Sequence, residues 1–273
     1  MPTLSHLHAT QDSAQSAALP NANRPFENDL DADLEFDNGF FDAAGFAAET
    51  LSDWRRMAAA IDHTLLKPEA TRTQVENLCD EAIRYRFACA MVNPVWVSRA
   101  SALLAGTGVP VGVVIGFPLG ATLASTLRQE AEALVRLGAR ELDMVISVGQ
   151  LKSGEHHAVE RTIRGVAEVA HQQGALLKVI LETCLLTVEE KLRASEIAIQ
   201  AGTDFLKTST GFSTGGATAA DVALLRGVAG ARCGVKASGG IRSLADARAM
   251  LEAGATRIGA SASVAIVREL GAE

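Results

Sequence analysis

The sequence contains few aromatic residues and few cysteines, and each shortage narrows the class of protein. Its 273 residues are 4% aromatic, with one tyrosine and two tryptophans, and the four cysteines form no CxxC pair. Neither a zinc site nor a disulfide framework is therefore predicted, and a chain of this length buries enough core to fold without either. The cysteines are expected to be buried thiols of a protein in a reducing compartment.

The sequence also lacks segments typical of export or membrane insertion. Its first residues, MPTLSHLHAT, have no basic start followed by an apolar run, so no secretory signal is predicted. The longest uncharged stretch, residues 100–127, contains prolines and glycines that fit a buried strand with its loops better than a membrane helix. No dense basic run with interleaved aromatics indicates nucleic-acid binding. We therefore expect a cytoplasmic protein that binds neither membrane nor nucleic acid.

The net charge of -7 is unevenly distributed along the chain. Residues 1–53 contain ten acidic residues and one basic residue, Arg24, whereas the remainder has a slight excess of positive charge. Residues 1–52 are predicted to be an acidic, mostly disordered extension that precedes a domain over residues 53–273. Five of the nine phenylalanines lie in this extension. Either its last part, roughly residues 39–57, folds as a helix against the domain, or the segment docks to a partner.

From residue 58 onward, short β-branched runs alternate with helical stretches. The runs are AAIDH, ACAMV, VGVVIGF, ELDMVIS, LLKVILE, DFLKTS, CGVKAS and TRIGA. One intervening stretch, residues 122–137, has apolar residues at helical spacing and is followed by Gly138 as a stop. A glycine and a small residue recur at other helix ends, at Gly174, Gly202 and Gly254.

Eight strand–helix units predict parallel pairing with right-handed crossovers. Such units close into an α/β fold of the (β/α)8 barrel type, also called a TIM barrel. The competing fold, an open doubly wound sheet, is expected to have a GxGxxG turn after its first strand, and AIDHTLLKP contains none. The barrel is therefore the predicted fold.

Three of the six lysines fall inside runs that otherwise predict buried strands. They are Lys178 in LLKVILET, Lys207 in DFLKTSTGF and Lys236 in GVKASGG, and Asp143 in ELDMVIS is a further polar residue of this kind. An isolated ammonium is costly to desolvate, so a buried lysine has either a structural partner or a chemical role. Three lysines beside a strand aspartate favour a chemical role, at the carboxyl ends of the barrel strands.

Lys207 and Lys236 occupy the same face of adjacent predicted strands. Side chains on that face meet in the barrel interior, so the two ammonium groups are expected to lie close together. Each disfavours the charge of the other, which leaves one of them as a neutral amine. Because a neutral amine forms a Schiff base with a carbonyl, the pair predicts an imine-forming site.

A second group of residues predicts a phosphate cradle. Gly211, Gly239, Gly240 and Ser261 follow the last three predicted strands, where backbone N–H groups are unobstructed and two loops lead into helix N-termini. Barrels often bind phosphate in these loops. Asp62 with His63 is a weaker candidate, either a proton relay or a structural pair.

At these positions the sequence resembles the deoxyribose-phosphate aldolase family. The matching motifs occur in order from residue 58 to the C-terminus and leave the extension unmatched. They are IDHTLLKP (61–68), VIGFPLG (114–120), ELDMVIS (141–147), LKVILET (177–183), FLKTSTGF (205–212), GVKASGGIR (234–242) and RIGAS (257–261). The resemblance implies a barrel fold and a lyase of the class I aldolase type, which cleaves 2-deoxy-D-ribose 5-phosphate reversibly to D-glyceraldehyde 3-phosphate and acetaldehyde.

The resemblance also implies roles for the predicted site residues. Lys207 would be the Schiff-base nucleophile, Lys236 the lysine that perturbs its pKa and relays protons, Asp143 a proton donor and acceptor acting with water, and Lys178 a supporting residue. Gly211, Gly239, Gly240 and Ser261 match the phosphate-binding positions. No metal and no cofactor are implied, and the implied partners are the sugar phosphate, acetaldehyde and a second copy in a homodimer.

One departure from the family concerns the last loop, where two serines are usual. Here Ser261 is followed by Ala262, which removes a hydroxyl donor unless Ser263 or backbone N–H groups compensate. Two other functions stay open from the residues alone. One is a different Schiff-base barrel aldolase that acts on a keto-sugar phosphate, and the other is a non-catalytic sugar-phosphate sensor.

Overall fold

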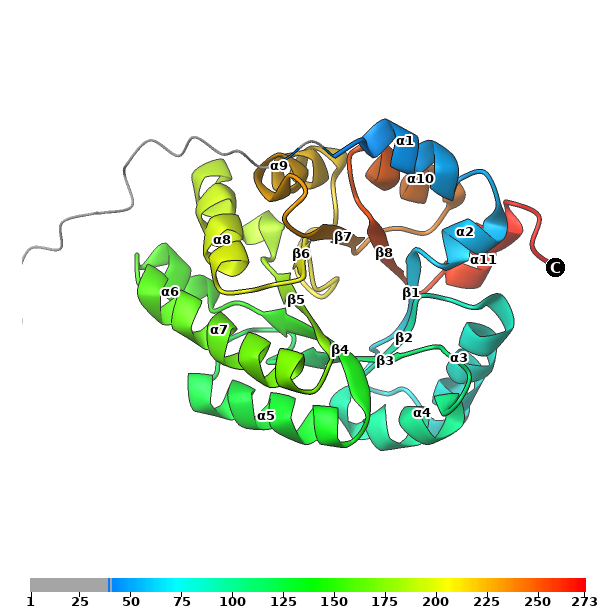
Figure 1. The fold of residues 1–273 in the computed structure, drawn as a ribbon, viewed down its shortest axis with the longest axis horizontal. Coiled ribbons are helices and arrows are strands. Elements are labelled where there is room, and N and C mark those ends of the chain that lie inside the picture. Colours follow the sequence, from blue (N-terminus) through cyan, green and yellow to red (C-terminus); the bar gives the residue numbers. More distant parts are fainter. Residues whose placement is uncertain (1–38, 40) are drawn as a thin grey trace, which may run out of the picture. The chain divides into compact units, whose positions relative to one another are not determined.

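Over the residues that the computed structural model describes, 39 and 41–273, eight parallel strands close into a barrel (Figure 1). Each strand pairs with the next one along the chain, and the last pairs with the first. The strands are β1 (Ile61–Leu65), β2 (Cys89–Val92), β3 (Val111–Ile115), β4 (Ala139–Val145), β5 (Leu176–Ile180), β6 (Phe205–Lys207), β7 (Gly234–Ser238) and β8 (Arg257–Ala260). The predicted (β/α)8 fold is confirmed.

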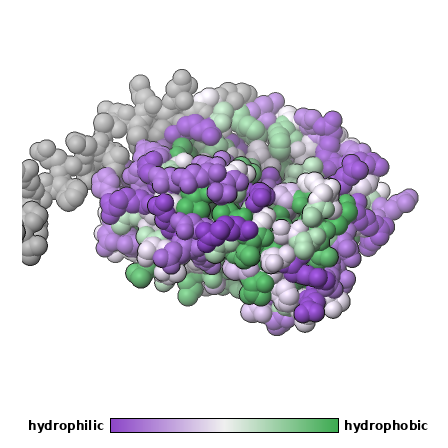
Figure 2. All heavy atoms as spheres, turned by 60° about the horizontal axis from the view of Figure 1, so that its bottom comes forward, coloured by the Kyte–Doolittle hydropathy of each residue, from purple (hydrophilic) through white to green (hydrophobic). Residues whose placement is uncertain are grey.

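Helices surround the barrel and connect its strands (Figure 1). They are α1 (Ala43–Thr50), α2 (Trp54–Ala58), α3 (Arg72–Tyr85), η1 (Pro94–Trp96), α4 (Val97–Leu104), α5 (Ala124–Arg136), α6 (Val148–Lys152), α7 (His156–Gln172), η2 (Thr183–Leu185), α8 (Val188–Gln200), α9 (Ala219–Ala229), α10 (Leu244–Glu252) and α11 (Ser263–Arg268). None of these described helices combines the length and apolar character needed for a membrane crossing. Figure 2 shows apolar patches among hydrophilic residues on one outer face.

The predicted glycine stops return the chain from helix to strand. Gly138 follows α5 with a φ of 108°, and Gly254 follows α10 with a φ of 107°. Side chains other than glycine rarely adopt this left-handed conformation. A Cβ at Gly138 would also lie 2.1 Å from the Ser101 Oγ atom. Glycine is therefore required both by conformation and by space at this turn.

The apolar residues form two separate clusters. The larger one fills the space between the barrel and its helices, while a small one inside the barrel consists of Leu66, Cys89, Met91 and Val114 with Phe117 packed against it. Because side chains alternate along a strand, the inward residues of β2 and β3 make this interior cluster. The charged strand residues come from the remaining strands, so the barrel interior has an apolar side and a charged side.

The last part of the predicted extension forms two helices rather than one. Asp42 caps α1 by accepting a hydrogen bond from the Gly45 N–H, and Asp53 caps α2 by accepting one from the Arg55 N–H. The second cap starts a new helix, which is why the helix expected over residues 39–57 is interrupted. In Figure 1, α1 lies beside α10.

The predicted division of the chain at residue 53 stays a prediction. The disorder and the partner docking predicted for the extension fall mainly on residues 1–38 and 40, which lie outside the described residues. Within the described part, α1 precedes residue 53 and packs on the barrel helix α10.

Candidate active site

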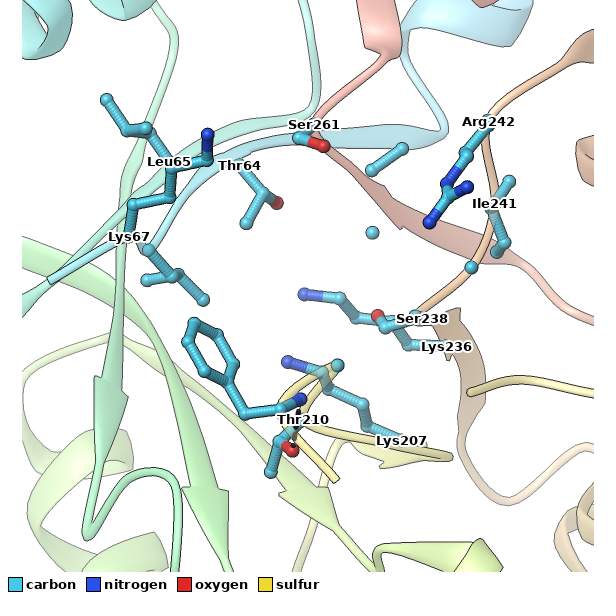
Figure 3. Close-up of a pocket in the computed structure, with 17 residues that line it drawn as sticks. Thr64, Leu65, Lys67, Lys207, Thr210, Lys236, Ser238, Ile241, Arg242 and Ser261 are labelled. Atoms are coloured by element: carbon cyan, nitrogen blue, oxygen red, sulfur yellow. Dashed lines mark hydrogen bonds between the residues drawn. The ribbon is translucent and has the colours of Figure 1, made fainter. Parts of the chain in front are cut away.

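The carboxyl ends of the strands surround a cavity of about 290 Å³. Lys207 and Lys236 point into it from one side, and Arg242 and Ser261 lie across from them (Figure 3). No carboxylate lines this cavity among the described residues, whereas Lys67 adds a further cation to its wall. The cavity is therefore suited to an anionic ligand that carries a group reactive toward amines.

Lys207 and Lys236 lie directly opposite each other on β6 and β7. Their amines share one acceptor, because the Asp143 Oδ2 atom is 2.7 Å from the Lys207 Nζ atom and 2.6 Å from the Lys236 Nζ atom. Both side chains are almost fully buried. The predicted proximity of the two lysines is thus observed, with a carboxylate between them.

The surroundings of Lys207 lower its pKa to about 8. Burial is the largest cause, because it penalises the charged form, and the positive charges of Lys236 and Lys178 act in the same direction. The Asp143 carboxylate opposes them but does not compensate. Repulsion between the lysines, which the sequence predicted as the cause, is therefore present but is smaller than the effect of burial.

Lys178 lies beneath the cavity and does not line it. Its Nζ atom is 2.5 Å from the Glu141 Oε2 atom and 2.9 Å from the Asp143 Oδ1 atom. Burial opposes its charge, yet Asp143, Asp62 and Glu141 outweigh burial and raise the pKa of Lys178 well above its usual value. Lys178 is therefore a permanent cation that holds Asp143 in place.

Asp143 keeps its negative charge although it is completely buried. Burial alone would raise its pKa, but Lys178, Lys207 and Lys236 lower the pKa well below its usual value. Both of its oxygens accept hydrogen bonds from lysine amines. Asp143 therefore fixes the positions of all three strand lysines.

Three further charged residues, Asp62, Glu141 and Arg257, belong to the same buried network as the predicted site residues. Asp62 on β1 accepts from Lys236 at 2.5 Å and from Arg257 at 2.6 Å, and Arg257 also contacts Glu141 at 3.3 Å. The alternation of side chains along a strand indicates the position of Glu141, since it lies two residues before Asp143 and therefore faces the same side of β4. Arg257 is the first residue of the motif RIGAS, and the motif alone gives no indication of these contacts.

Asp62 and His63 do not form a relay, so that reading of the pair is wrong. Adjacent strand residues point to opposite faces, and Asp62 faces the barrel interior. His63 faces the helices, where its Nε2 atom lies 2.8 Å from the Glu81 Oε2 atom and its ring packs on Phe87. Burial lowers the pKa of His63, with Glu81 opposing this effect.

All four residues of the predicted phosphate cradle line the same cavity as the two lysines. Gly211, Gly239 and Gly240 have φ values of 83°, 88° and 84°, so their backbone adopts the left-handed conformation. The loops also approach closely, because a Cβ on Gly216 would lie 2.3 Å from the Gly239 carbonyl oxygen. Ser261 completes this wall. The structure thus brings the predicted amine pair and the predicted cradle together.

Ser263 does not replace the hydroxyl that is missing at Ala262. Its Oγ atom donates a hydrogen bond to the Ala260 carbonyl at 2.8 Å and is buried. Arg242 and Lys67, which the sequence analysis did not single out, supply positive charge to the cavity instead. Arg242 directly follows GGI, so its position beside the glycines was detectable from the sequence.

One cluster in the described part of the chain has the spacing of metal ligands, namely Asp62, Cys89 and Glu141. Both carboxylates accept hydrogen bonds from lysine or arginine in this structure. Burial raises the pKa of the Cys89 thiol well above its usual value, which disfavours the thiolate that binds a metal. These contacts explain the cluster as the anionic part of an ion-pair network.

Comparisons with known proteins show which proteins the chain is similar to. The model of the DeoC/LacD family of aldolases matches residues 56–269. The chain is 56% identical to deoxyribose-phosphate aldolase of Geobacillus sp. strain WCH70 over 211 residues, 77% of this chain and 94% of that protein. For the enzyme of that name from Lysinibacillus sphaericus, the identity is 54% over 79% and 96% of the two chains. The tetrameric deoxyribose phosphate aldolase of Aeropyrum pernix superposes with a TM-score of 0.78 at 38% identity, covering 84% of this chain and 96% of that structure.

Proposed function

The chain belongs to the DeoC/LacD family of aldolases, and we propose that it is a deoxyribose-phosphate aldolase whose Schiff base forms on Lys207. The observation that carries this assignment is the Lys207 amine with a pKa of about 8 at the wall of a cationic cavity. Lys178 and Lys236 are the other strand lysines, and of these only Lys236 lines the cavity.

The proposed reaction begins with attack of the neutral Lys207 amine on the C1 aldehyde of open-chain deoxyribose 5-phosphate. Loss of water gives a protonated imine, which accepts the electron pair of the C2–C3 bond when the C3 hydroxyl loses its proton. Glyceraldehyde 3-phosphate leaves with C3 as its aldehyde carbon. The remaining enamine takes a proton at C2, and water hydrolyses the imine to acetaldehyde and the free lysine.

Lys236 and Asp143 are proposed to manage the protons of this reaction. Lys236 lines the cavity, so its ammonium can reach the reacting atoms, whereas Asp143 lies beneath and joins the Lys207 and Lys236 amines through one oxygen. A proton can therefore pass between the two lysines over two short hydrogen bonds. A positioned acid or base of this kind contributes on the order of 10²- to 10⁴-fold to the rate.

The phosphate of the substrate is proposed to bind at Gly211, Gly239, Gly240 and Ser261. Backbone N–H groups in these loops are suited to an anion, and Arg242 adds charge to the same wall. The loss of one serine hydroxyl at Ala262 is expected to weaken phosphate binding by about 1 kcal/mol.

Two further features belong to this proposal. We propose a homodimer, which is consistent with exposed apolar side chains such as Val95 and Leu119, 78% and 75% exposed. Light scattering distinguishes it from the tetramer described for the Aeropyrum pernix relative. We also propose that the enzyme acts in the cytoplasm, where charged sugar phosphates are retained.

Trapping with borohydride tests the reaction class and the nucleophile together. Incubation with acetaldehyde and borohydride should add a stable two-carbon adduct to the peptide that contains Lys207, and Lys207→Ala should lose both adduct and activity. Normal activity in Lys207→Ala contradicts the proposal. Cleavage of a ketose phosphate faster than deoxyribose 5-phosphate identifies the other aldolase class, and tight binding without turnover identifies a sensor.

A further inference from the structure

We propose that Arg257 is a positioning residue that sets the number of protons held by the buried network, and thereby keeps the Lys207 amine available for attack. This inference rests on the proposed function, because it concerns the same nucleophile. Arg257 does not touch the substrate cavity. It acts at the opposite end of the barrel, through the carboxylates beneath the lysines.

Arg257 begins β8, at the amino-terminal end of the barrel strands. Its side chain is 14% exposed and borders a second cavity of about 390 Å³, at the barrel floor, which residues of α1 and α2 also line. The Arg257 Nη1 atom donates to Asp62 at 2.6 Å and also contacts Glu141 at 3.3 Å. The guanidinium also lies 5.3 Å from the centre of the Phe205 ring.

A continuous chain of ion pairs connects Arg257 to Lys207. The Asp62 Oδ1 atom accepts a hydrogen bond from Arg257, and its Oδ2 atom accepts one from Lys236. Lys236 in turn shares the Asp143 Oδ2 atom with Lys207. Three hydrogen-bonded groups therefore separate the guanidinium from the nucleophile, and all of them are buried.

By formal charge this network balances when one of its lysines is neutral, and Lys207 is the lysine whose pKa the surroundings lower. Six strands contribute charged groups to it, and the described part of the barrel interior contains no others near them. They are Asp62 of β1, Glu141 and Asp143 of β4, Lys178 of β5, Lys207 of β6, Lys236 of β7 and Arg257 of β8. Cys89 of β2 also faces them, as a thiol with a raised pKa.

Counted by formal charge, three carboxylates thus face three cations when Lys207 is an amine, and a fourth cation when it is an ammonium. In a buried site, excess charge of one sign is unfavourable. Arg257 is the cation best suited to hold its charge, because a guanidinium stays protonated and Asp62 and Glu141 raise its pKa against the effect of burial. Loss of Arg257 would leave the network with one positive charge too few. Protonation of Lys207 would then restore the balance.

The test uses variants that change the charge at the floor in opposite directions. Arg257→Met removes a positive charge and should move the acidic limb of the pH profile of kcat/KM upward by about one pH unit. Glu141→Gln removes a negative charge and should move the same limb downward. The double variant Arg257→Met/Glu141→Gln should return the limb to the wild-type position, because its balance is restored.

Two control variants separate charge from packing. Arg257→Lys keeps the charge and should keep the limb in place. Arg56→Met removes an arginine from the wall of the same floor cavity, where it pairs with Glu49 instead of the network, and should leave the limb unchanged. A purely structural role would lower the unfolding temperature of Arg257→Met without moving its acidic limb upward.

The outcome is decisive even if Arg257→Met does not fold, because Glu141→Gln alone must still move the limb downward. An unshifted limb in folded Glu141→Gln or folded Arg257→Met overturns the inference. The proposed function has its own readout, the trapped acetaldehyde adduct at Lys207. If the adduct forms but the acidic limbs do not shift, only the inference about Arg257 is rejected. If no adduct forms on the wild-type protein, the proposed function is rejected.

Discussion

Gly259 makes room for the Lys236 side chain. It lies opposite Ser238 on the neighbouring strand, and a Cβ built on it would be 2.3 Å from the Ser238 Oγ atom and 3.0 Å from the Lys236 Cε atom. Real Cβ atoms do not approach other atoms at the first distance, so the Ser238 side chain would have to move, and the Lys236 side chain would have to shift by a few tenths of an ångström. The absent side chain therefore helps to place the lysine.

Gly259→Ala should lower kcat for deoxyribose 5-phosphate cleavage by roughly 10-fold, less than the roughly 10²-fold effect of a 1 Å displacement at a reacting group, because the Lys236 side chain shifts by only a few tenths of an ångström. The control is Gly165→Ala in α7, where an added Cβ meets no neighbour. It should keep full activity and gain about 0.5–1 kcal/mol of stability. Steady-state kinetics and thermal unfolding measure both. An unchanged kcat in Gly259→Ala would contradict the role of Gly259 in placing Lys236.

At the residue scale, the sequence identifies the groups that contrast with their surroundings. Lys207, Lys236 and Asp143 interrupt apolar strands, so they are detectable without a structure. Glu141 and Arg257 lie in the amino-terminal parts of their strands, where exposed charged residues are ordinary, and only the closed barrel shows that they meet. Their partners are distant in the chain, with Arg257 bonded to Asp62.

Helices α3, α8 and α10 each begin with a capping box, and the last two allow a direct comparison. In α8, Thr187 and Glu190 exchange hydrogen bonds, and in α10, Ser243 and Asp246 do so. The second box has an additional contact, because the Asp246 Oδ2 atom also accepts from the Arg242 N–H at 3.0 Å. Only the α10 cap therefore organises the loop that carries the predicted phosphate site.

Thr187→Ala and Ser243→Ala should each lose about 1 kcal/mol of stability, the usual contribution of an N-cap. Only Ser243→Ala should also raise KM for deoxyribose 5-phosphate, while its effect on unphosphorylated 2-deoxyribose should be small. Chemical denaturation and kinetics with the two substrates measure these changes. An equal rise in KM for both variants would argue against a specific role of the α10 cap.

At the element scale, the pattern of residues locates helices well and their interruptions poorly. The helix expected over residues 122–137 spans Ala124–Arg136. Its apolar residues recur at helical spacing, and a glycine follows it. The break between α1 and α2 is not evident from the sequence, because Asp53 is one of several scattered acidic residues in this segment and nothing there distinguishes a capping aspartate from a solvated one.

The whole molecule places a charged network and an apolar cluster side by side within one barrel. The fold was predictable because strand and helix alternate regularly, and alternation depends only on local periodicity. The balance of buried charge was not predictable, since it depends on which seven side chains share one interior. Among them, Lys207 is the group whose protonation carries a cost in the folded state.

This cost makes the stability of the protein depend on pH. Folding lowers the pKa of Lys207 from 10.5 to about 8, so between these values the unfolded chain binds more protons than the folded one. Stability therefore rises with pH across this window, and the penalty is fully present below about pH 8. A difference of this size corresponds to roughly 3 kcal/mol.

Lys207→Met should therefore be inactive and yet more stable than the wild-type protein at pH 7, by roughly 2–3 kcal/mol. Methionine fills a similar volume without a charge, and Asp143 keeps Lys178 and Lys236 as partners. The difference should shrink as the pH rises from 8 toward 10, because the folded wild-type protein then holds Lys207 as a neutral amine and the unfolded chain begins to lose the same proton. Urea denaturation at pH 7, 8.5 and 10 measures it. Equal stability at pH 7, or a difference that does not change with pH, would mean that burial of the Lys207 ammonium is compensated within the network.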